Sequence, residues 1–277
     1  MLSKKSTNLK EETKVPKTIH LMWFSGDEYP TDIQICIKSW KRVLPDFNIK
    51  VWTKDMAMQC DIPYMLEALE CKKWAFAADV LRLYALYTEG GVYMDSDILV
   101  LKRFDEFMNN EVAFFQEYHK NLGEKALKLG VINSEGCRTG DSPPCGIGLQ
   151  AAFIIAQKGS RVIKYLLDYY IDKHFIKPNG EIATDTISPT IFALRAEVFG
   201  YRYIDEEQTL FPGIKVYPSY YVAPGKNERD KRNFAIHCIS HSWAEQTIMY
   251  RIIQMIKIPI RKLMGIDVKS LAKKANK

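Results

Sequence analysis

The segment from Trp74 to Val100 constrains the fold most, because it joins a helical pattern to a strand pattern through two glycines. Apolar residues in Trp74–Glu89 recur at helical spacing, and Gly90-Gly91 follows directly. Glycine ends helices readily, since it adopts the left-handed conformation after the last turn without strain. A strand-like run, Val92–Val100, comes next. The chain is therefore expected to turn a helix back onto a strand, as α/β proteins do.

The same alternation of strands and helices extends on both sides of this segment. The other predicted strands cover residues 17–24, 48–52, 151–156, 215–217 and 234–237. The other predicted helices cover residues 32–43, 54–70, 160–174 and 185–199. We therefore predict the α/β class, with a Rossmann-like mixed sheet that is mainly parallel and has helices on both of its faces.

Two stretches between these elements are harder to assign. Residues 118–148 are rich in Gly, Ser, Pro and Asn, and the stretch is too long for a plain connection. We therefore expect a loop of an active site, on the side of a second substrate, or else disorder. Cys137 and Cys145 lie in this stretch and are close enough in sequence to pair. Glu181 and Asp185 lie at or just before the start of the last predicted helix, and we interpret them as caps of that helix. The alternative is that they contact a second substrate.

Composition excludes several classes of protein. No run of about 18 uncharged apolar residues exists, so we do not expect a membrane-spanning helix. The six cysteines show neither CxxC pairs nor a zinc spacing, which is typical of a reduced intracellular protein. The net charge of +6 comes from residues 251–277, where eight Lys or Arg stand against one Asp. The rest of the chain is close to neutral and has no recognition motif, so nucleic-acid binding is not expected.

Two aspartates, Asp95 and Asp97, lie two residues apart in the predicted strand Val92–Val100. Aspartate is disfavoured in strands, and alternate residues share one face, so both carboxylates are expected on the same face. Carboxylate and phosphate oxygens are the ligands that Mg²⁺ and Mn²⁺ prefer. Taken alone, an Asp-x-Asp pair is more often a solvated turn or a cap, and its context has to decide.

The preceding helix supplies that context through Asp79 and Arg82, which lie three residues apart and thus on one face. The plain interpretation is a surface ion pair worth well under ~1 kcal/mol. The functional interpretation is that the guanidinium of Arg82 binds phosphate or sugar oxygens, while Asp79 accepts hydrogen bonds from sugar hydroxyls.

Three ordered blocks make the sequence recognisable. The central block is AADVLRLYALYTEGGVYMDSDI at residues 77–98, the first is PKTIHLMW at residues 16–23, and the last is AIHCISHSW at residues 235–243. Together they resemble glycosyltransferase family 32, which includes yeast mannosyltransferases and bacterial capsule enzymes. The helix, the double glycine and the Asp-x-Asp pair are also similar to the glucosyltransferase domains of large clostridial toxins.

The resemblance implies a GT-A fold over residues 16–245. Residues 1–15 before it are polar and rich in lysine, and we expect them to form a flexible tail. It also implies donor-binding roles for individual residues. Trp23 matches the tryptophan that stacks on the donor base, and Tyr93 lies beside the nucleotide. The positions matched to donor binding are Trp23, Asp79, Arg82, Tyr93, Asp95, Ser242 and Trp243, and those matched to catalysis are Asp95, Asp97 and Arg82.

The resemblance further implies a divalent cofactor, Mn²⁺ or Mg²⁺. Asp95 would face ribose and metal, and Asp97 would be the direct ligand. His237 is the first choice for a third ligand. Family members often have two adjacent histidines here, whereas this chain has Cys238 at the second position and an additional His241, so His237 and His241 compete.

The expected function is therefore that of a metal-dependent hexosyltransferase that retains anomeric configuration. A UDP-sugar is the favoured donor and GDP-mannose the alternative. The expected acceptor is a glycan or a lipid-linked oligosaccharide of capsule or surface polysaccharide synthesis. Two alternatives remain: a catalytically silent module that binds nucleotide sugars or recruits other proteins, and a glycoside hydrolase, which would need two carboxylates and usually no metal.

The final segment, residues 246–277, has the pattern of a basic amphipathic helical tail. Ile, Met and Leu residues between Ile248 and Met264 fall on one side at helical spacing, while Arg251, Lys257 and Arg261 fall on the other. An apolar face with basic residues around it suits an anionic membrane surface. We therefore expect a cytoplasmic enzyme held peripherally on the inner face of the membrane. The alternative is a last helix that packs on the domain.

Overall fold

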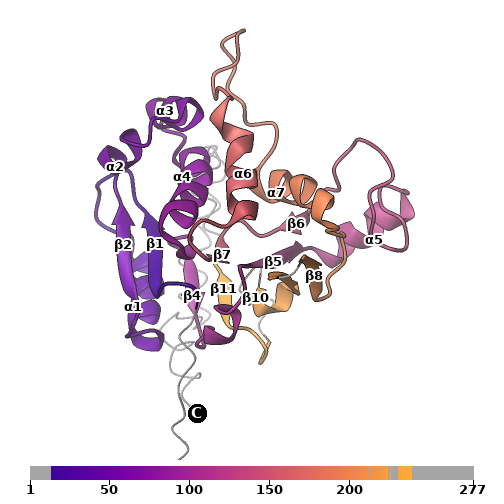
Figure 1. Cartoon of the computed structure of the whole chain (residues 1–277), viewed down its shortest axis with the longest axis horizontal. Helices are drawn as coiled ribbons and strands as arrows, with labels where there is room; N and C mark the ends of the chain where they lie inside the picture. Colours follow the sequence, from indigo (N-terminus) through magenta and orange to yellow (C-terminus); the bar gives the residue numbers. More distant parts are fainter. Residues whose placement is uncertain (1–13, 212, 224, 226–229, 239–277) are drawn as a thin grey trace, which may run out of the picture. The chain divides into compact units, whose positions relative to one another are not determined.

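The computed structural model describes residues 14–211, 213–223, 225 and 230–238 of the chain (Figure 1). The larger sheet contains β1 (Thr18–Met22), β2 (Asn48–Trp52), β3 (Gly91–Met94), β5 (Val112–Tyr118), β6 (Ile147–Leu149), β7 (Phe153–Ala156), β8 (Gln208–Phe211) and β9 (Ile214–Tyr217). The smaller sheet contains β4 (Ile98–Val100), β10 (Val222–Ala223) and β11 (Ala235–His237). The helices are α1 (Thr31–Val43), α2 (Lys54–Met58), α3 (Pro63–Glu70), α4 (Trp74–Glu89), α5 (Lys120–Lys128), α6 (Arg161–Ile171) and α7 (Ser188–Ala196).

The larger sheet is mixed. Its strand order is β2-β1-β3-β7-β5-β9-β8, with β6 paired to β5. Strand β1 lies parallel to β2 and β3, and β5 lies parallel to β9, whereas β7 is antiparallel to both β3 and β5. The predicted α/β class and the mixed sheet flanked by helices are confirmed. Parallel pairs do not predominate as expected, because β7 enters the centre of the sheet in the opposite direction.

Alternation along the strands divides the core into two layers. Side chains at even positions of β5 and β7 pack with α3, α4, α6 and α7 on one face. Those at odd positions pack with α1 and the smaller sheet on the other face. The strands of the larger sheet are buried on both faces in its centre, which explains their nearly continuous apolar sequences.

The double glycine is required by close packing. Gly90 and Gly91 have φ values of 70° and 114°, which side chains rarely adopt. A Cβ atom on Gly91 would lie 2.5 Å from the carbonyl oxygen of Thr18 on the neighbouring strand. The imidazole of His20 is buried, and its Nε2 lies 2.7 Å from the Gly90 oxygen. The helix α4 therefore ends where the sequence predicts, and β3 begins one residue before the predicted Val92.

Two predicted elements are each divided in two. The helix expected over residues 54–70 is interrupted because Asp61 takes a positive φ of 48° and Pro63 begins a new helix, α3. The strand expected over residues 92–100 stops after Met94 and resumes at Ile98, and its two halves join different sheets.

The last predicted helix begins at Ser188, so Glu181 and Asp185 lie before it and the predicted caps are wrong.

The stretch over residues 118–148 is ordered by its pairing. It contains α5 and returns as β6, which pairs antiparallel with β5 from Gln116 to Tyr118. Cys137 and Cys145 are both free and exposed, so they do not form the local pair that the sequence allows. In the part of the chain that the structure describes, no helix has both the length and the apolar character needed to cross a membrane.

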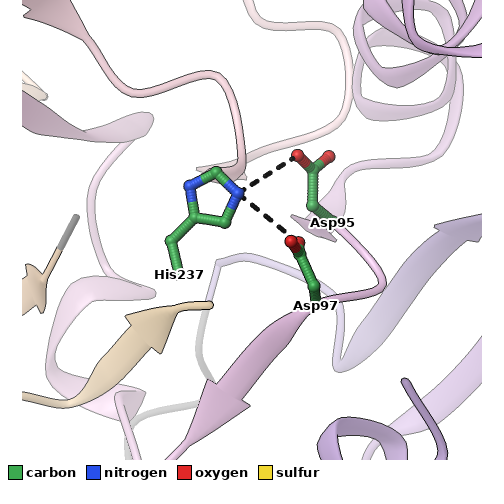
Figure 2. A group of neighbouring side chains, drawn as sticks. All are labelled: Asp95, Asp97 and His237. Carbon is green, nitrogen blue, oxygen red and sulfur yellow. Dashed lines mark ion pairs between the residues drawn. The ribbon is translucent and has the colours of Figure 1, made fainter. Parts of the chain in front are cut away.

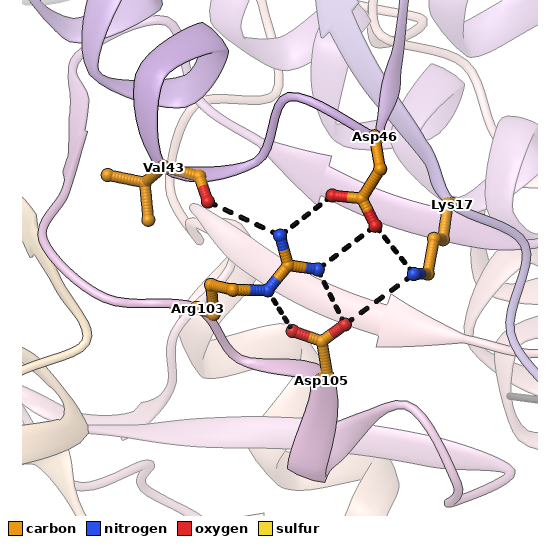
Figure 3. Close-up of polar contacts among 5 residues, drawn as sticks. All are labelled: Lys17, Val43, Asp46, Arg103 and Asp105. Carbon is orange, nitrogen blue, oxygen red and sulfur yellow. Dashed lines mark hydrogen bonds and ion pairs between the residues drawn. The ribbon is translucent and has the colours of Figure 1, made fainter. Parts of the chain in front are cut away.

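A surface ion cluster ties three connections of the fold together (Figure 3). Arg103 donates to both oxygens of Asp46 at 2.7 and 3.1 Å and to both oxygens of Asp105 at 2.8 Å. Lys17 donates to Asp46 at 2.6 Å. These residues precede β1, join α1 to β2, and follow β4. All four are partly exposed, so solvent screens each pair.

We expect Arg103→Ala to lower the free energy of unfolding by about 1 kcal/mol, because two bidentate pairs are lost in a screened setting. The loss should shrink as salt is added. Urea denaturation at low and high salt measures both effects. Lys120→Ala, which removes a long and exposed pair with Glu124, is the control and should change stability by less than about 0.5 kcal/mol. Equal effects of the two substitutions at low salt would contradict the role of the cluster.

Candidate metal and donor site

The Asp-x-Asp pair lies in a turn between the two sheets. Strand β3 ends at Met94, and the amide of Asp95 donates to the carbonyl of Ala152 at 2.9 Å. The amide of Ile98 then donates to the carbonyl of Asp95 at 3.0 Å, which closes the turn. The expectation that both carboxylates share one face of a strand is therefore wrong. The turn between Asp95 and Ile98 brings them together instead.

Strand register places His237 beside this turn. Strand β11 is antiparallel to β4, and His237 pairs with Ile98, the residue that follows Asp97. The amide of Cys238 donates to the carbonyl of Asp97 at 3.0 Å and extends this pairing by one step. Backbone hydrogen bonds therefore fix the position of His237 beside Asp97, although the two residues lie 140 positions apart in the sequence.

Three side chains converge at this point (Figure 2). The Nε2 atom of His237 lies 3.4 Å from Oδ1 of Asp97 and 3.9 Å from Oδ2 of Asp95. One ligand atom from each of the three residues lies within 4.8 Å of the others. Asp97 is nearly buried, whereas about a third of the Asp95 side chain is exposed. The cluster is thus anchored on one side and open on the other.

The carboxylates near His237 change the pKa of its imidazole. Burial opposes protonation of His237, but the hydrogen bond to Asp97 and the negative charges of Asp97, Asp95 and Glu117 outweigh it and raise the pKa of His237 to about 8. Glu117 lies on β5, and burial raises the pKa of its carboxyl, while the positive charges of His237 and His119 act in the opposite direction. Three carboxylates around one imidazole make a site that attracts cations.

The donor set fits a divalent cation. Two carboxylates and one imidazole suit Mn²⁺, and the oxygen ligands also suit Mg²⁺. With three protein ligands on one side and an exposed edge on the other, oxygens of a bound anion have room to complete the coordination.

Behind this cluster, Arg82 and Asp79 form a buried pair on α4. Arg82 donates from Nη2 to Asp79 at 2.7 Å, from Nη1 to the carbonyl of Ala151 at 2.6 Å, and from Nε to the carbonyl of Ala78 at 3.1 Å. Its Nη1 also lies 3.7 Å from Oδ1 of Asp95. Burial raises the pKa of Asp79 to about 6 despite the charge of Arg82. The pair is therefore part of the interior, and the plain interpretation of a surface ion pair is wrong.

The hydroxyl of Tyr93 joins this pair to the cluster. It donates to Oδ1 of Asp95 at 2.5 Å, and the guanidinium of Arg82 lies 4.5 Å from the centre of its ring. Burial raises the pKa of Tyr93 well above its ordinary value, so the hydroxyl keeps its proton. Asp95 is thus oriented by Tyr93 and Arg82 together.

Trp23 follows directly after β1 and remains partly exposed. Its Nε1 donates to the carbonyl of Asp27 at 2.7 Å, and its ring lies 4.8 Å from that of Tyr29. Both contacts hold the indole in place without covering it. His241, Ser242 and Trp243 lie outside the described residues, as do residues 246–277, and their predicted roles stay predictions.

Glu117 is the site residue that the sequence did not reveal. It lies on β5, a strand that we did not predict, although VAFF before Gln116-Glu117 is an apolar run that ends in polar residues. The same pattern, VYM before Asp95, was the signal that identified the Asp-x-Asp pair.

These features define a class: an α/β protein with a carboxylate and imidazole site for a divalent cation at the end of a central strand. Residues 30–114 match the model of a family described as "Glycosyltransferase sugar-binding region containing DXD motif". The resemblance to glycosyltransferases that contain this motif, predicted from the sequence, is thereby confirmed for the region that carries Asp79, Arg82, Asp95 and Asp97.

Two relatives match parts of the chain. "Toxin Afp18" of Yersinia ruckeri is 33% identical over 88 residues, which cover 31% of this chain and 4% of the toxin. "Inositol phosphoceramide mannosyltransferase 3" of Schizosaccharomyces pombe is 27% identical over 103 residues, which cover 36% of this chain and 29% of the relative. The chain thus matches less than a third of the length of either relative.

Solved structures resemble the chain more distantly. "PaToxG Glycosyltransferase" has a TM-score of 0.44 and 17% identity, with 66% of this chain and 69% of the other covered. The galactosyltransferase LgtC, solved with donor and acceptor sugar analogs, has a TM-score of 0.38 and 12% identity, with 79% of this chain and 86% of the other covered.

Proposed function

We propose that this protein is a metal-dependent glycosyltransferase that moves a hexose from a nucleotide-sugar donor, preferentially a UDP-sugar, to a glycan acceptor. One observation supports this most strongly: Asp95, Asp97 and His237 bring their ligand atoms within 4.8 Å of one another. The match of residues 30–114 to a DXD-containing sugar-binding region supports the same function. Of the two relatives, the Schizosaccharomyces pombe mannosyltransferase supports transfer chemistry by its name, although the chain matches only 29% of its length.

In this proposal Asp95, Asp97 and His237 hold Mn²⁺ or Mg²⁺. The bound ion supplies positive charge that stabilises the diphosphate as it departs. Tyr93 and Arg82 keep the Asp95 carboxylate in one orientation, so that no reorganisation is needed during the reaction. Asp79, fixed by Arg82, presents its remaining acceptor capacity to donor hydroxyls, and the ring of Trp23 stacks on the base. Positioning and electrostatics supply the rate enhancement, and no covalent nucleophile is proposed.

The proposal is tested by incubating the full chain with single nucleotide sugars, with Mn²⁺, Mg²⁺ or a chelator, and measuring release of the nucleoside diphosphate. We expect slow release from one donor that the chelator abolishes. Binding of the donor without any turnover would indicate the silent module instead. Chelator-insensitive cleavage of a glycoside would indicate a hydrolase.

Trp23→Ala should weaken binding of UDP in the presence of metal without changing which sugar is preferred, because the base lies far from the sugar. Base stacking on aromatic side chains is worth roughly 1–3 kcal/mol in nucleic-acid cases, which corresponds to a loss of about 5- to 150-fold. Calorimetric titration of UDP measures the loss. Trp23→Phe retains a stacking ring and should recover most of the affinity. Unchanged UDP affinity with a large loss of stability would assign Trp23 to the core instead.

We further propose that the acceptor is lipid-linked, in capsule or surface polysaccharide synthesis, and that residues 246–277 hold the enzyme on an anionic membrane surface. The basis is the sequence alone: an apolar face bordered by basic residues, each worth ~1 kcal/mol near anionic headgroups. We expect the full chain to sediment with anionic vesicles at moderate salt, and a truncation after Tyr250 to stay in solution. Equal sedimentation of the two would make the segment structural.

A further inference from the structure

One pocket of the protein is lined by residues that have no role in the proposed metal site. Its volume is about 380 Å³, within the roughly 300–1,000 Å³ typical of small-molecule sites. It lies between α3, the end of α6 and the start of α7, and is bordered by the connection from α6 to α7, which extends beyond the end of α6 (Figure 1). Lys173 and His174 of this connection are exposed, so the pocket is open to solvent. Its chemically informative lining residues are Tyr64, Tyr169, Lys173, His174, Lys177 and Asp185.

The connection from α6 to α7, which borders the pocket, is held by contacts within itself and with α3. Ile176 and Ile182 pair antiparallel, and the amide of Ile176 donates to Glu67 of α3 at 2.9 Å. The other oxygen of Glu67 lies 2.5 Å from Nδ1 of His174. The hydroxyl of Tyr64 donates to the carbonyl of Ala183 at 3.4 Å. The pocket is therefore held by contacts from both of its sides.

The pocket combines aromatic rings with an excess of basic groups. Lys177 is paired with Asp185 at 2.5 Å, and His174 is paired with Glu67. Lys173 instead lies over the ring of Tyr169, 3.7 Å from its centre, and within the described residues it has no carboxylate within 4 Å. A lysine held over an aromatic ring and exposed to solvent is available to an anionic ligand.

The wall of the pocket continues into the donor site. The ring of Tyr64 contacts that of Tyr170, with centres 5.1 Å apart. Burial first and the charge of Asp79 second raise the pKa of Tyr64 and of Tyr170. Asp79 in turn binds Arg82, which lies 3.7 Å from Asp95. The pocket residue Tyr64 is thus linked to the Asp79–Arg82 pair by its ring contact with Tyr170 and by the charge of Asp79.

We infer that this pocket is an acceptor subsite that binds a sugar unit carrying a negative charge. The inference rests on the proposed function, which supplies the need for an acceptor close to the donor. The aromatic walls suit the C–H faces of a sugar ring, and the paired groups Asp185 and Lys177 suit its hydroxyls. Lys173 supplies a cation for a carboxylate or phosphate substituent. The ligand class is therefore an anionic hexose, free or within a glycan.

The test uses ligand-observed NMR on the full chain with three probes: methyl β-D-glucuronide, methyl β-D-glucoside and inorganic phosphate. We expect the glucuronide to bind best, the glucoside more weakly, and phosphate alone weakest of the three. Lys173→Ala should weaken the glucuronide roughly fivefold and leave the glucoside nearly unchanged, while Tyr169→Ala should weaken both. The matched controls Lys164→Ala and Tyr165→Ala lie on α6, as Tyr169 does, but outside the pocket, and should leave binding unchanged.

Sugar binding that is absent, or equal in the wild type and the two pocket variants, would overturn the subsite. So would phosphate that binds as tightly as the glucuronide, since a general anion site needs no sugar. These results are independent of donor turnover. Sugar binding in the pocket with no metal-dependent donor hydrolysis would remove the proposed function and leave the pocket as a sugar site, whereas hydrolysis without sugar binding here would remove only the subsite.

Discussion

Asp97→Ala is expected to abolish metal-dependent donor hydrolysis while the protein stays folded. Asp97 is nearly buried, and its carboxylate lies 3.4 Å from the Nε2 atom of His237, so it is the best anchored of the three candidate ligands. Removal of a direct ligand should cost more than the roughly 10- to 100-fold typical of groups that only support ligands. The substitution removes little apolar volume, so thermal unfolding should shift only slightly. Turnover and Mn²⁺ binding, measured on the same preparation, test both parts.

Two further variants sharpen this prediction. Asp97→Asn keeps the shape and removes the charge, and should be nearly as inactive as the alanine variant. Asp55→Ala removes an exposed aspartate on α2 and should leave turnover unchanged. A folded Asp97→Ala protein with wild-type turnover and wild-type Mn²⁺ affinity would end the assignment of Asp97 as a ligand.

Arg82→Ala is expected to destabilise the fold as well as the activity. Arg82 is 4% exposed, and its guanidinium donates to Asp79 and to the carbonyls of Ala78 and Ala151. Loss of one partner from a buried pair leaves an uncompensated charge, which typically costs about 3–5 kcal/mol. Urea denaturation should show this loss directly, and the effect should depend little on salt because the pair is buried.

The double variant Asp79→Asn with Arg82→Gln separates stability from function. Without a net buried charge, it should recover a large part of the stability lost in Arg82→Ala. Donor hydrolysis should stay low, because Asp95 then lacks the guanidinium beside it. If Arg82→Ala unfolds at the same urea concentration as the wild type, Arg82 has the more exposed, ligand-binding role that the sequence resemblance implies.

The sequence predicts correctly those helices whose bounds depend only on neighbouring residues. Helix α4 has the predicted bounds because its apolar spacing and the double glycine act within a few residues. Asp95, Asp97 and His237, which the sequence suggested as metal ligands, lie together in the structure, but the two aspartates lie in a turn and not within one strand. The run VYMDSDILV alternates like one strand, yet the amide of Asp95 pairs with Ala152 and the strand then joins a second sheet. Such pairings depend on distant segments and leave no local signal.

The same limit explains why Glu117 was missed and why His237 was found only through a resemblance. Nothing near Glu117 in the sequence indicates that β5 runs toward the site. His237 reaches Asp97 through the register of β11 on β4, which a single sequence does not specify. Arg82 and Asp79 were recognised as neighbours from helical spacing, but their burial follows from α6 and the loop before β7, which cover α4.

The most direct test of the metal-dependent account is a crystal structure of the full chain with UDP and Mn²⁺, with anomalous diffraction collected at the manganese edge. We predict one strong anomalous peak within bonding distance of Asp97 and His237, beside Asp95, and in contact with the diphosphate. Well-ordered UDP with no manganese at these three residues, or manganese bound elsewhere in the chain, would contradict the account.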